Sequence, residues 1–530
     1  MSSNTDTISL NDGHGLVGKR ERPFSRLLPA RSNPYDLSQL STLAGLMNTT
    51  DQFHDGVDGE ENLYVPAGYT YLGQFVDHDL TFDTTSSLKP LSEDPLQPDP
   101  SNLRSPRFDL DCVYGAGPSD QPYMYDGAKL LYGKTLDGGG KDDLMRIGPA
   151  GKERAVIGDK RNDENSIVCQ IQLAFIKFHN RVVDRLLATQ FSGDLFERAR
   201  SEVRWTYQKI LLEDYLRRII SAVTYDFFDQ QWRGQGEAAY QLYKPALRGN
   251  VPLEFSGAAY RFGHSMIRQG YRLNTQTGKD IFKPNDANQD DSLIGFGPLA
   301  SSHVIDDWRR FFADNSLPPG ARPLENVDPP GFQPTDVRLQ WAYKIDPTMS
   351  NPLANLPAPI ASSKDLPAAF QGELPSLSRF NLFRANKFGI QSGQAFAAAL
   401  KEPALDPKYL CVRVRNANGS FGYQAIDACF ARDTPLWFYI LAEAQVSVMD
   451  MWMAEGRRDL VDEDFLSGQG AVAQLGPVGG RILLETFYGL MDADPESFRQ
   501  AEQGGWTPMV TEGGAKPCTM WSLLEFTGLV

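Results

Sequence analysis

The sequence has few of the side chains that most often bind transition metals or form disulfides. Only six of the 530 residues are histidine and only five are cysteine. The cysteines are widely spaced and none belongs to a CxxC pair, so neither a zinc site nor a dense disulfide framework is expected. We expect reduced and mostly buried thiols at all five positions, which are Cys112, Cys169, Cys411, Cys429 and Cys518.

Positively charged residues and long apolar runs are also few. The 52 lysines and arginines are outnumbered by 67 acidic residues, which leaves a formal net charge of −15. Such a surface disfavours nucleic acid and anionic membranes as partners. No apolar run approaches 18 residues, so no membrane span is expected. The first 23 residues contain no apolar segment of the secretory type. A cytoplasmic protein is the default expectation, with leaderless secretion as the alternative.

The residues that are abundant indicate a globular and mainly α-helical protein. Apolar side chains make up 41% of the chain, aromatic ones 11% and charged ones 22%, which allows a core large enough to enclose a cofactor. Helical patterns occupy four segments, which are Ser166–Leu187, Leu195–Ile220, residues 391–402 and Pro435–Glu455. The first of these is apolar on nearly every face and is expected to be buried. Alternating runs of β-branched residues are scarce, so little β structure is expected.

Proline and glycine predict long loops around one large body. Five prolines fall in residues 83–107 and six in residues 315–335, so both segments are expected to be irregular. Residues 1–65 are polar and broken by glycine and proline, and we expect an arm that wraps the body. Residues 66–500 are expected to form a single large domain, with residues 501–530 packed on it as a C-terminal extension.

The most informative stretch, GQFVDHDLTF, places His78 between Asp77 and Asp79. A lone histidine of this kind is usually a hydrogen-bonded core residue. An adjacent His–Asp pair also provides metal ligands in phosphohydrolases, but that chemistry needs further ligands to converge. Four other histidines do not stand in HxxxH or HxxE settings, and they are His14, His54, His179 and His303.

A second candidate histidine, His264, stands in the apolar stretch GAAYRFGHSMIRQGYRL. Two histidines from distant apolar segments could face each other across a flat cofactor such as haem. Haem iron takes one neutral imidazole, and peroxide chemistry needs a base and a fixed cation on the opposite, open face. The turn AVIGDKRNDENS carries Arg161, which could supply the cation, although an arginine on such a turn is more often a surface residue.

Five stretches resemble, in order and spacing, the animal-type haem peroxidases of the peroxidase–cyclooxygenase superfamily. They are GQFVDHDLTF, FDLDCVYG, IGDKRNDEN followed by FHNR, YRFGHSMI and FNLFRANKFGI. The later stretches TPLWFYILAEA and LGPVGGRILLE are similar to its bacterial branch. Each motif alone is weak, but five in order are specific. The resemblance implies a mainly α haem peroxidase domain with long loops.

The resemblance implies that three residues act on the open face of the haem. His78 matches the histidine that moves the peroxide proton, and Arg161 matches the arginine that stabilises peroxide heterolysis. Gln74, one helical turn before His78, matches the glutamine that orders water or halide near the iron. The implied reaction is reduction of hydrogen peroxide with oxidation of a small organic, halide or pseudohalide donor, which would suit a response to oxidative stress.

The resemblance also implies residues that hold haem b. His264 matches the iron ligand, and Asn381 matches the asparagine whose side-chain oxygen accepts a hydrogen bond from the other ring nitrogen. Asp77 and Glu164 match carboxylates that form esters with haem methyl groups in mammalian members. The alternative is that both remain free acids at the haem edge.

Two positions separate the possible members of the superfamily. Arg261, three residues before His264, stands where cyclooxygenases carry a radical tyrosine, which favours a peroxidase. Tyr260 lies one position earlier, and one step turns a helical side chain by about 100°, so Tyr260 is not expected to replace that tyrosine. Asn165 stands where a mammalian member has the methionine of a sulfonium link, so that link is not expected.

Asp79 points away from the face of its neighbour His78, as adjacent helical residues do, and matches a calcium ligand of the family. The resemblance implies partners from the loop SPRFDLD, which are Ser105, the carbonyl of Arg107, Asp109 and Asp111. Oxygen donors suit Ca²⁺, which takes six to eight of them. The alternative is a solvated acidic loop. Calcium bound here would fix the helix that carries His78.

Three rival functions stay open on the sequence alone. A haem fatty-acid dioxygenase of the same superfamily would need an apolar channel and a tyrosyl radical. A metal-dependent phosphohydrolase would bind no haem. A non-catalytic interaction protein on a peroxidase scaffold is disfavoured because no key position has been lost. The donor substrate, the covalent state of the haem and the oligomeric state are left open.

Overall fold

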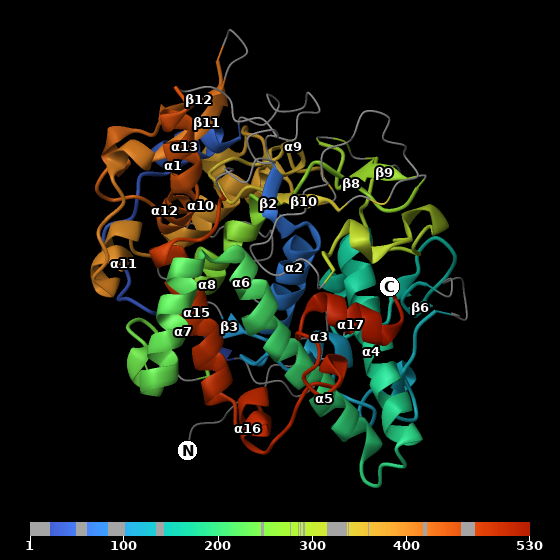
Figure 1. Cartoon of the computed structure of the whole chain (residues 1–530). Helices are drawn as coiled ribbons and strands as arrows, with labels where there is room; N and C mark the ends of the chain where they lie inside the picture. Colours follow the sequence, from blue (N-terminus) through green and yellow to red (C-terminus); the bar gives the residue numbers. More distant parts are fainter. Residues whose placement is uncertain are drawn as a thin grey trace, which may run out of the picture.

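The computed structural model describes most of the chain. The described residues are 22–48, 61–82, 101–133, 142–244, 249–275, 277–284, 286, 288–289, 292–314, 337, 339–358, 360–416, 421–456 and 472–530. Outside them lie about half of the predicted N-terminal arm, most of the first predicted proline-rich loop, all of the second, and His14 and His54. The described residues are mainly helical, as predicted (Figure 1).

Helix α2 (Gly68–Leu80) lies near the middle of the molecule (Figure 1). It packs against α4 (Ser166–Ala188) and the 3-10 helix η8 (Ala259–His264). Helix α2 also lies close to Tyr215, because Gly73 has no side chain at that contact. A Cβ atom on Gly73 would stand 2.6 Å from the Tyr215 hydroxyl. Helix α2 is therefore held against its neighbours over most of its surface.

Helix α4 confirms the buried helix expected from the sequence. Its N-cap residue is Asn165, whose side chain accepts hydrogen bonds from the backbone N–H groups of Ile167 and Val168. Capping of this kind satisfies N–H groups that have no partner inside the helix. The cap fixes the point where the chain turns from the short 3-10 helix η4 (Lys160–Asp163) into α4.

The second predicted helix is interrupted. Helix α5 (Leu195–Ile210) runs into a π-helical turn, Leu211–Tyr215, before α6 (Leu216–Ile219). A π turn inserts one extra residue and changes which side chains share a face. Tyr215, the last residue of the turn, lines the central cavity described below.

The segments predicted as helices in the C-terminal half are confirmed. Residues 391–402 contain α11 (Gly393–Leu400). Pro435–Glu455 forms two helices, α12 (Leu436–Ala444) and α13 (Val446–Ala454), which meet at Gln445. Two helices that the sequence patterns did not single out are α10 (Leu377–Lys387) and α15 (Pro477–Ala493).

The remaining described elements are helices of up to 14 residues and short strands. The other α-helices are α1 (Leu37–Met47), α3 (Asp111–Tyr114), α7 (Ala222–Gln235), α8 (Leu253–Gly257), α9 (Asn351–Ala354), α16 (Phe498–Gln503) and α17 (Met520–Thr527). Strands form antiparallel pairs, which are β1 (Arg22–Pro23) with β3 (Ser101–Asn102), β2 (Glu61–Pro66) with β10 (Trp341–Tyr343), β4 (Tyr125–Asp126) with β5 (Lys129–Leu130), β6 (Arg146–Ile147) with β7 (Arg154–Ala155), β8 (Gly270–Arg272) with β9 (Gly278–Asp280) and β11 (Cys411–Arg415) with β12 (Phe421–Ala425).

The last thirty residues pack on the helical body. The indole N–H of Trp506 donates to the buried Glu202 carboxylate at 2.8 Å, and the Met520 backbone N–H donates to Asp214 at 3.0 Å. The five thiols are free, and all but the exposed Cys429 are buried. Among the described residues, no helix is both long and apolar enough to cross a lipid bilayer.

Candidate active site

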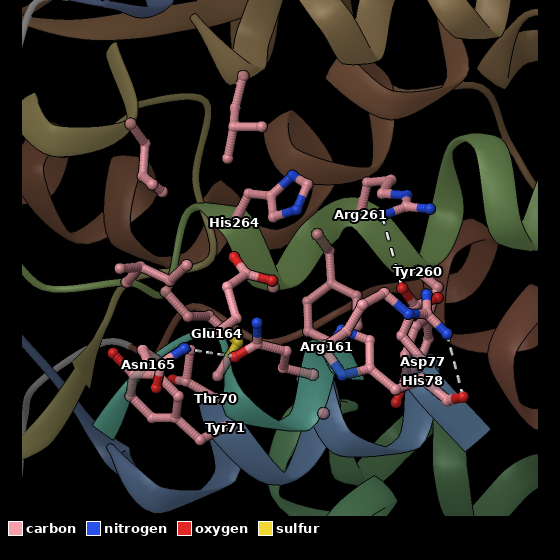
Figure 2. A pocket seen from close by; sticks show the side chains of 18 of the residues that line it. Thr70, Tyr71, Asp77, His78, Arg161, Glu164, Asn165, Tyr260, Arg261 and His264 are labelled. Carbon is pink, nitrogen blue, oxygen red and sulfur yellow. Dashed lines mark hydrogen bonds and ion pairs between the residues drawn. The ribbon is translucent and has the colours of Figure 1, made fainter. Parts of the chain in front are cut away.

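A cavity of about 350 Å³ lies beside α2 and is lined by both candidate histidines. Figure 2 shows His264 on one side of it and α2, with Thr70, Tyr71, Asp77 and His78, on the other. Apolar side chains such as Met266, Phe282 and Leu356 complete the wall. The volume is within the range of small-molecule sites. Distant segments of the chain therefore meet at one cavity.

His78 is buried, and its ring is held by an amide. Its Nδ1 atom lies 2.7 Å from Oδ1 of Asn162, and the Asn162 amide N–H donates to Oε1 of Gln172 at 2.8 Å. Because Oδ1 can only accept, Nδ1 carries the proton and Nε2 keeps its lone pair. Burial and the nearby Arg161 charge lower the pKa of His78 to about 4. The imidazole is therefore neutral near pH 7 and can act as a base.

Arg161 lines the same cavity, and its catalytic role stays a prediction. Its Nη2 donates to the backbone oxygens of His78 at 3.2 Å and Thr81 at 2.6 Å, and to the Asp159 carboxylate at 2.8 Å. The guanidinium also lies over the Phe82 ring, 4.8 Å from its centroid. Burial alone would raise the pKa of Asp159, but the charges of Arg161 and Arg104 hold that pKa well below its usual range. The cation is thus fixed in place.

Gln74 and Asn165 line the same cavity and contact each other. The Asn165 amide donates to Oε1 of Gln74 at 3.1 Å, so the N-cap of α4 also orients Gln74 (Figure 2). The structure brings together Gln74, His78 and Arg161, the three residues predicted to act on the open face.

His264 is the last residue of η8, so it lies on a short 3-10 helix. Its Nδ1 is 2.7 Å from the Asn381 amide Nδ2, while Oδ1 of Asn381 is buried without a hydrogen-bond partner. Rotating the amide by 180° exchanges these atoms and lets Oδ1 accept from Nδ1–H. Nε2 then has a free lone pair. Burial, Arg261 and Arg384 lower the pKa of His264 to about 3, which keeps the ring neutral.

The two candidate ester-forming acids both line the cavity but differ in charge state. Asp77 accepts from the Thr81 hydroxyl at 2.9 Å and lies 3.5 Å from Nη1 of Arg261. Although burial raises the pKa of Asp77, the charges of Arg261 and Arg161 outweigh it and lower the pKa. Burial raises the pKa of Glu164 to about 7. Asp77 is ionised near neutral pH, and Glu164 is in part protonated.

Tyr260 lines the cavity beside Arg261. Its hydroxyl donates to the Tyr215 hydroxyl at 3.1 Å, and its ring stacks on Phe255. The rotation between neighbouring residues therefore does not remove Tyr260 from the cavity, and its expected failure to replace the radical tyrosine stays a prediction.

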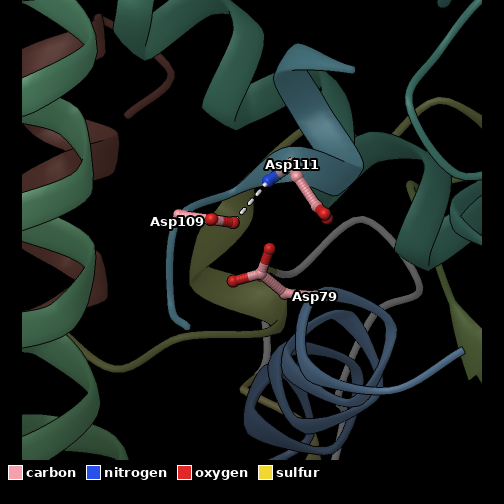
Figure 3. Close-up of side chains that lie close together, drawn as sticks. All are labelled: Asp79, Asp109 and Asp111. Carbon is pink, nitrogen blue, oxygen red and sulfur yellow. Dashed lines mark hydrogen bonds between the residues drawn. The ribbon is translucent and has the colours of Figure 1, made fainter. Parts of the chain in front are cut away.

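Behind α2, three carboxylates converge (Figure 3). Each of Asp79, Asp109 and Asp111 offers one oxygen within 4.8 Å of the others. The Ser105 hydroxyl donates to Asp109 at 2.6 Å, so Ser105 lies beside the cluster, and its role as a ligand stays a prediction. Arg107 directs its guanidinium to Asp494 at 3.4 Å, and the part played by its carbonyl remains a prediction.

The acidic cluster has the properties of a cation site. Oδ2 of Asp79 is buried without a hydrogen-bond partner. Burial and repulsion from Asp109 and Asp111 raise the pKa of Asp79 well above its usual value. Carboxylate oxygens of this kind suit Ca²⁺. Among the described residues, this is the one cluster of His, Cys, Asp or Glu side chains that could hold a metal ion. It contains no histidine, so it does not support the interpretation as a metal-dependent phosphohydrolase.

Several functional candidates were not found from the sequence. Asn162 and Gln172 orient His78, and Asp159 anchors Arg161. The one available signal was the position of Asp159 and Asn162 within two residues of Arg161 in the same turn.

Comparison with known proteins identifies related chains. The model of the animal haem peroxidase family matches residues 102–302, which include Arg161 and His264. Pig thyroid peroxidase is 32% identical over 113 residues, or 21% of this chain and 11% of its own length. Fruit-fly dual oxidase is 25% identical over 166 residues, 31% of this chain and 9% of its own length. The matched stretches thus span a small part of these relatives.

Two solved structures are similar along nearly the whole chain. Peroxidase A from Dictyostelium discoideum aligns with a TM-score of 0.54 at 15% identity, covering 96% of this chain and 93% of that one. The fatty acid alpha-dioxygenase of Oryza sativa aligns with a TM-score of 0.50 at 14% identity, covering 95% and 79%. At these identities the likeness establishes the fold alone.

Proposed function

We propose that this chain belongs to the animal haem peroxidase family, whose model matches residues 102–302, and that it is a haem peroxidase that reduces hydrogen peroxide with electrons from a small donor. The observation that supports the proposal most strongly is one cavity with two neutral imidazoles on its walls and a fixed guanidinium beside one of them.

The residues present fit a haem. His264 would bind the iron through Nε2, because Nδ1 is taken by the Asn381 amide and the ring is neutral. When bound, the haem supplies an iron that coordinates peroxide and takes up the oxidising equivalents. Asp77 and Glu164 lie in the cavity wall, where either could become an ester to the cofactor.

Side chains of the protein transfer the peroxide proton and stabilise the negative charge that develops on the departing oxygen. Nε2 of His78 takes a proton from the oxygen of peroxide that will remain, and returns it to the oxygen that leaves as water. Asn162 keeps Nε2 unprotonated between turnovers by accepting from Nδ1. Arg161 stabilises negative charge on the departing oxygen, and its anchor at Asp159 removes the cost of reorienting it.

Haem reconstitution tests the proposal. The purified chain should take up haem with a Soret band, react rapidly with hydrogen peroxide, and lose that reaction but not the haem in His78→Ala. Absence of a Soret band after reconstitution would refute a haem enzyme. A pyridine haemochrome before and after acid–acetone extraction reports covalent attachment, and ester bonds would be established if Asp77→Asn and Glu164→Gln release the haem.

A haem fatty-acid dioxygenase remains the second candidate because Tyr260, hydrogen-bonded to Tyr215, lines the cavity. A buried phenol at that place could supply the radical such a reaction needs. Oxygen uptake with linoleate in the absence of peroxide turnover, lost in Tyr260→Phe, would favour the dioxygenase. The bacterial branch, the calcium ion, the donor and the suggested role in oxidative stress are likewise proposals.

A further inference from the structure

We propose that Arg104 and Asp159 are positioning residues that couple cation binding at the acidic cluster to the placement of Arg161 in the cavity. This inference rests on the proposed function for its link to peroxide chemistry. Neither residue was singled out by the sequence, and neither lines the cavity.

The coupling consists of four buried or partly buried charges of alternating sign. Nη1 of Arg104 lies 2.9 Å from Oδ1 of Asp111 in the acidic cluster, and its Nη2 contacts the Asp159 carboxylate. Asp159 in turn binds Arg161 through Nε at 3.2 Å, Nη2 at 2.8 Å and the backbone N–H at 2.9 Å. Arg104 and Asp159 are only 4% and 2% exposed, so solvent screens these contacts weakly.

The charges of this group call for a divalent cation. When Asp79 is ionised, as it would be with a cation bound, Asp79, Asp109, Asp111 and Asp159 bring four negative charges and Arg104 and Arg161 bring two positive ones, which leaves two negative charges. Buried charge is costly unless it is balanced. A bound Ca²⁺ would balance it, and would attract the same Asp111 carboxylate that Arg104 holds.

The placement of Arg104 has two opposite consequences. Its guanidinium repels a cation in the cluster and occupies one oxygen of Asp111, so it weakens cation binding. It also fixes Asp159, and through Asp159 it fixes Arg161. Replacement of Arg104 should therefore both strengthen cation binding and loosen Arg161. Replacement of an arginine with a purely structural role would not produce this pair of effects.

The test compares Arg104→Met with Arg481→Met. Arg481 is a matched control because it is equally buried and paired with Glu485 at 2.6 Å, but contacts neither Asp111 nor Asp159. Calcium affinity is measured by titration calorimetry of the full chain. Fluoride affinity of the haem-loaded ferric protein is measured from the Soret shift, because an anion in the cavity is stabilised by Arg161.

Arg104→Met should bind Ca²⁺ roughly tenfold more tightly and fluoride severalfold more weakly, and calcium chelation should also change the fluoride affinity of the wild type. Arg481→Met should change neither. Unchanged calcium affinity in Arg104→Met would overturn the inference, and this measurement does not need haem. A missing Soret band would refute the proposed function and would leave the calcium result unaffected. Unchanged fluoride affinity would overturn the coupling. If Arg104→Met does not fold, Arg104→Lys keeps the charge but cannot bridge both carboxylates, and it should weaken fluoride binding alone.

Discussion

Replacement of Asn162 by alanine should slow the reaction with peroxide without removing the haem. Asn162 is fully buried, and its Oδ1 atom, 2.7 Å from Nδ1 of His78, selects the tautomer that leaves Nε2 free. Without this acceptor the Nδ1–H group is buried and unsatisfied, and the tautomer with a proton on Nε2 gains population. That tautomer cannot take a proton from peroxide.

The size of the effect follows from the hydrogen bond that is lost. An unsatisfied buried donor costs about 1–3 kcal/mol, and each 1.36 kcal/mol changes a rate tenfold. The second-order rate constant for peroxide, measured by stopped flow at the Soret band, should therefore fall about 5- to 150-fold. Asn162→Asp keeps an acceptor oxygen and should retain much more of the rate.

A matched amide controls for lost stability. The Asn180 side chain bonds the backbone N–H and oxygen of Leu130, both at 2.8 Å, and does not line the cavity. Asn180→Ala should therefore lower stability and leave the peroxide rate unchanged. A wild-type rate in Asn162→Ala would refute the assignment of a tautomer-selecting role to this amide.

Three further predictions follow from the same contacts. Arg161→Leu should slow the peroxide reaction about 100-fold in stopped flow, because removal of one preorganised donor costs about that much, while the haem content measured by pyridine haemochrome stays the same. Gly73→Ala should lower the free energy of unfolding by about 1–3 kcal/mol in urea titrations, because its Cβ would meet the Tyr215 hydroxyl at 2.6 Å; an unchanged midpoint would show that this contact relaxes freely. In the calcium-free protein the pKa of Asp79 is raised when folded, so the folded chain binds this proton more tightly than the unfolded chain, and the contribution of Asp79 to stability should fall as the pH rises above about 4. The lowered pKa values of His78 and His264 act in the opposite direction, so thermal melts are compared with and without saturating Ca²⁺, and a pH dependence that is the same in both would contradict a cation site at Asp79.

The sequence was sufficient to predict what depends on local pattern and motif order. The apolar run after Asn165 predicted α4. The order of the motifs predicted that His78, Arg161 and His264 belong to one site, and all three line one cavity. These features depend on helical periodicity or on spacing shared with a known family, and both can be read from the chain.

Contacts between distant segments could not be predicted in this way. The bond from Asn162 to His78 joins residues 84 positions apart, and Arg104 reaches Asp159 across 55 positions. Neither contact follows from a repeat or a periodicity. The π turn at Leu211–Tyr215 was also not predicted, because the apolar pattern of Leu195–Ile220 continues across it. Its last residue, Tyr215, lines the cavity beside Tyr260.

The central claim is that a haem lies between the two imidazoles and is bound through His264. Resonance Raman spectroscopy of the reconstituted ferrous protein tests it most directly, since it detects the iron–histidine stretch. We predict that the band is present in the wild type and in His78→Ala and absent from His264→Gly. A band that survives in His264→Gly, or that disappears in His78→Ala, would contradict the account.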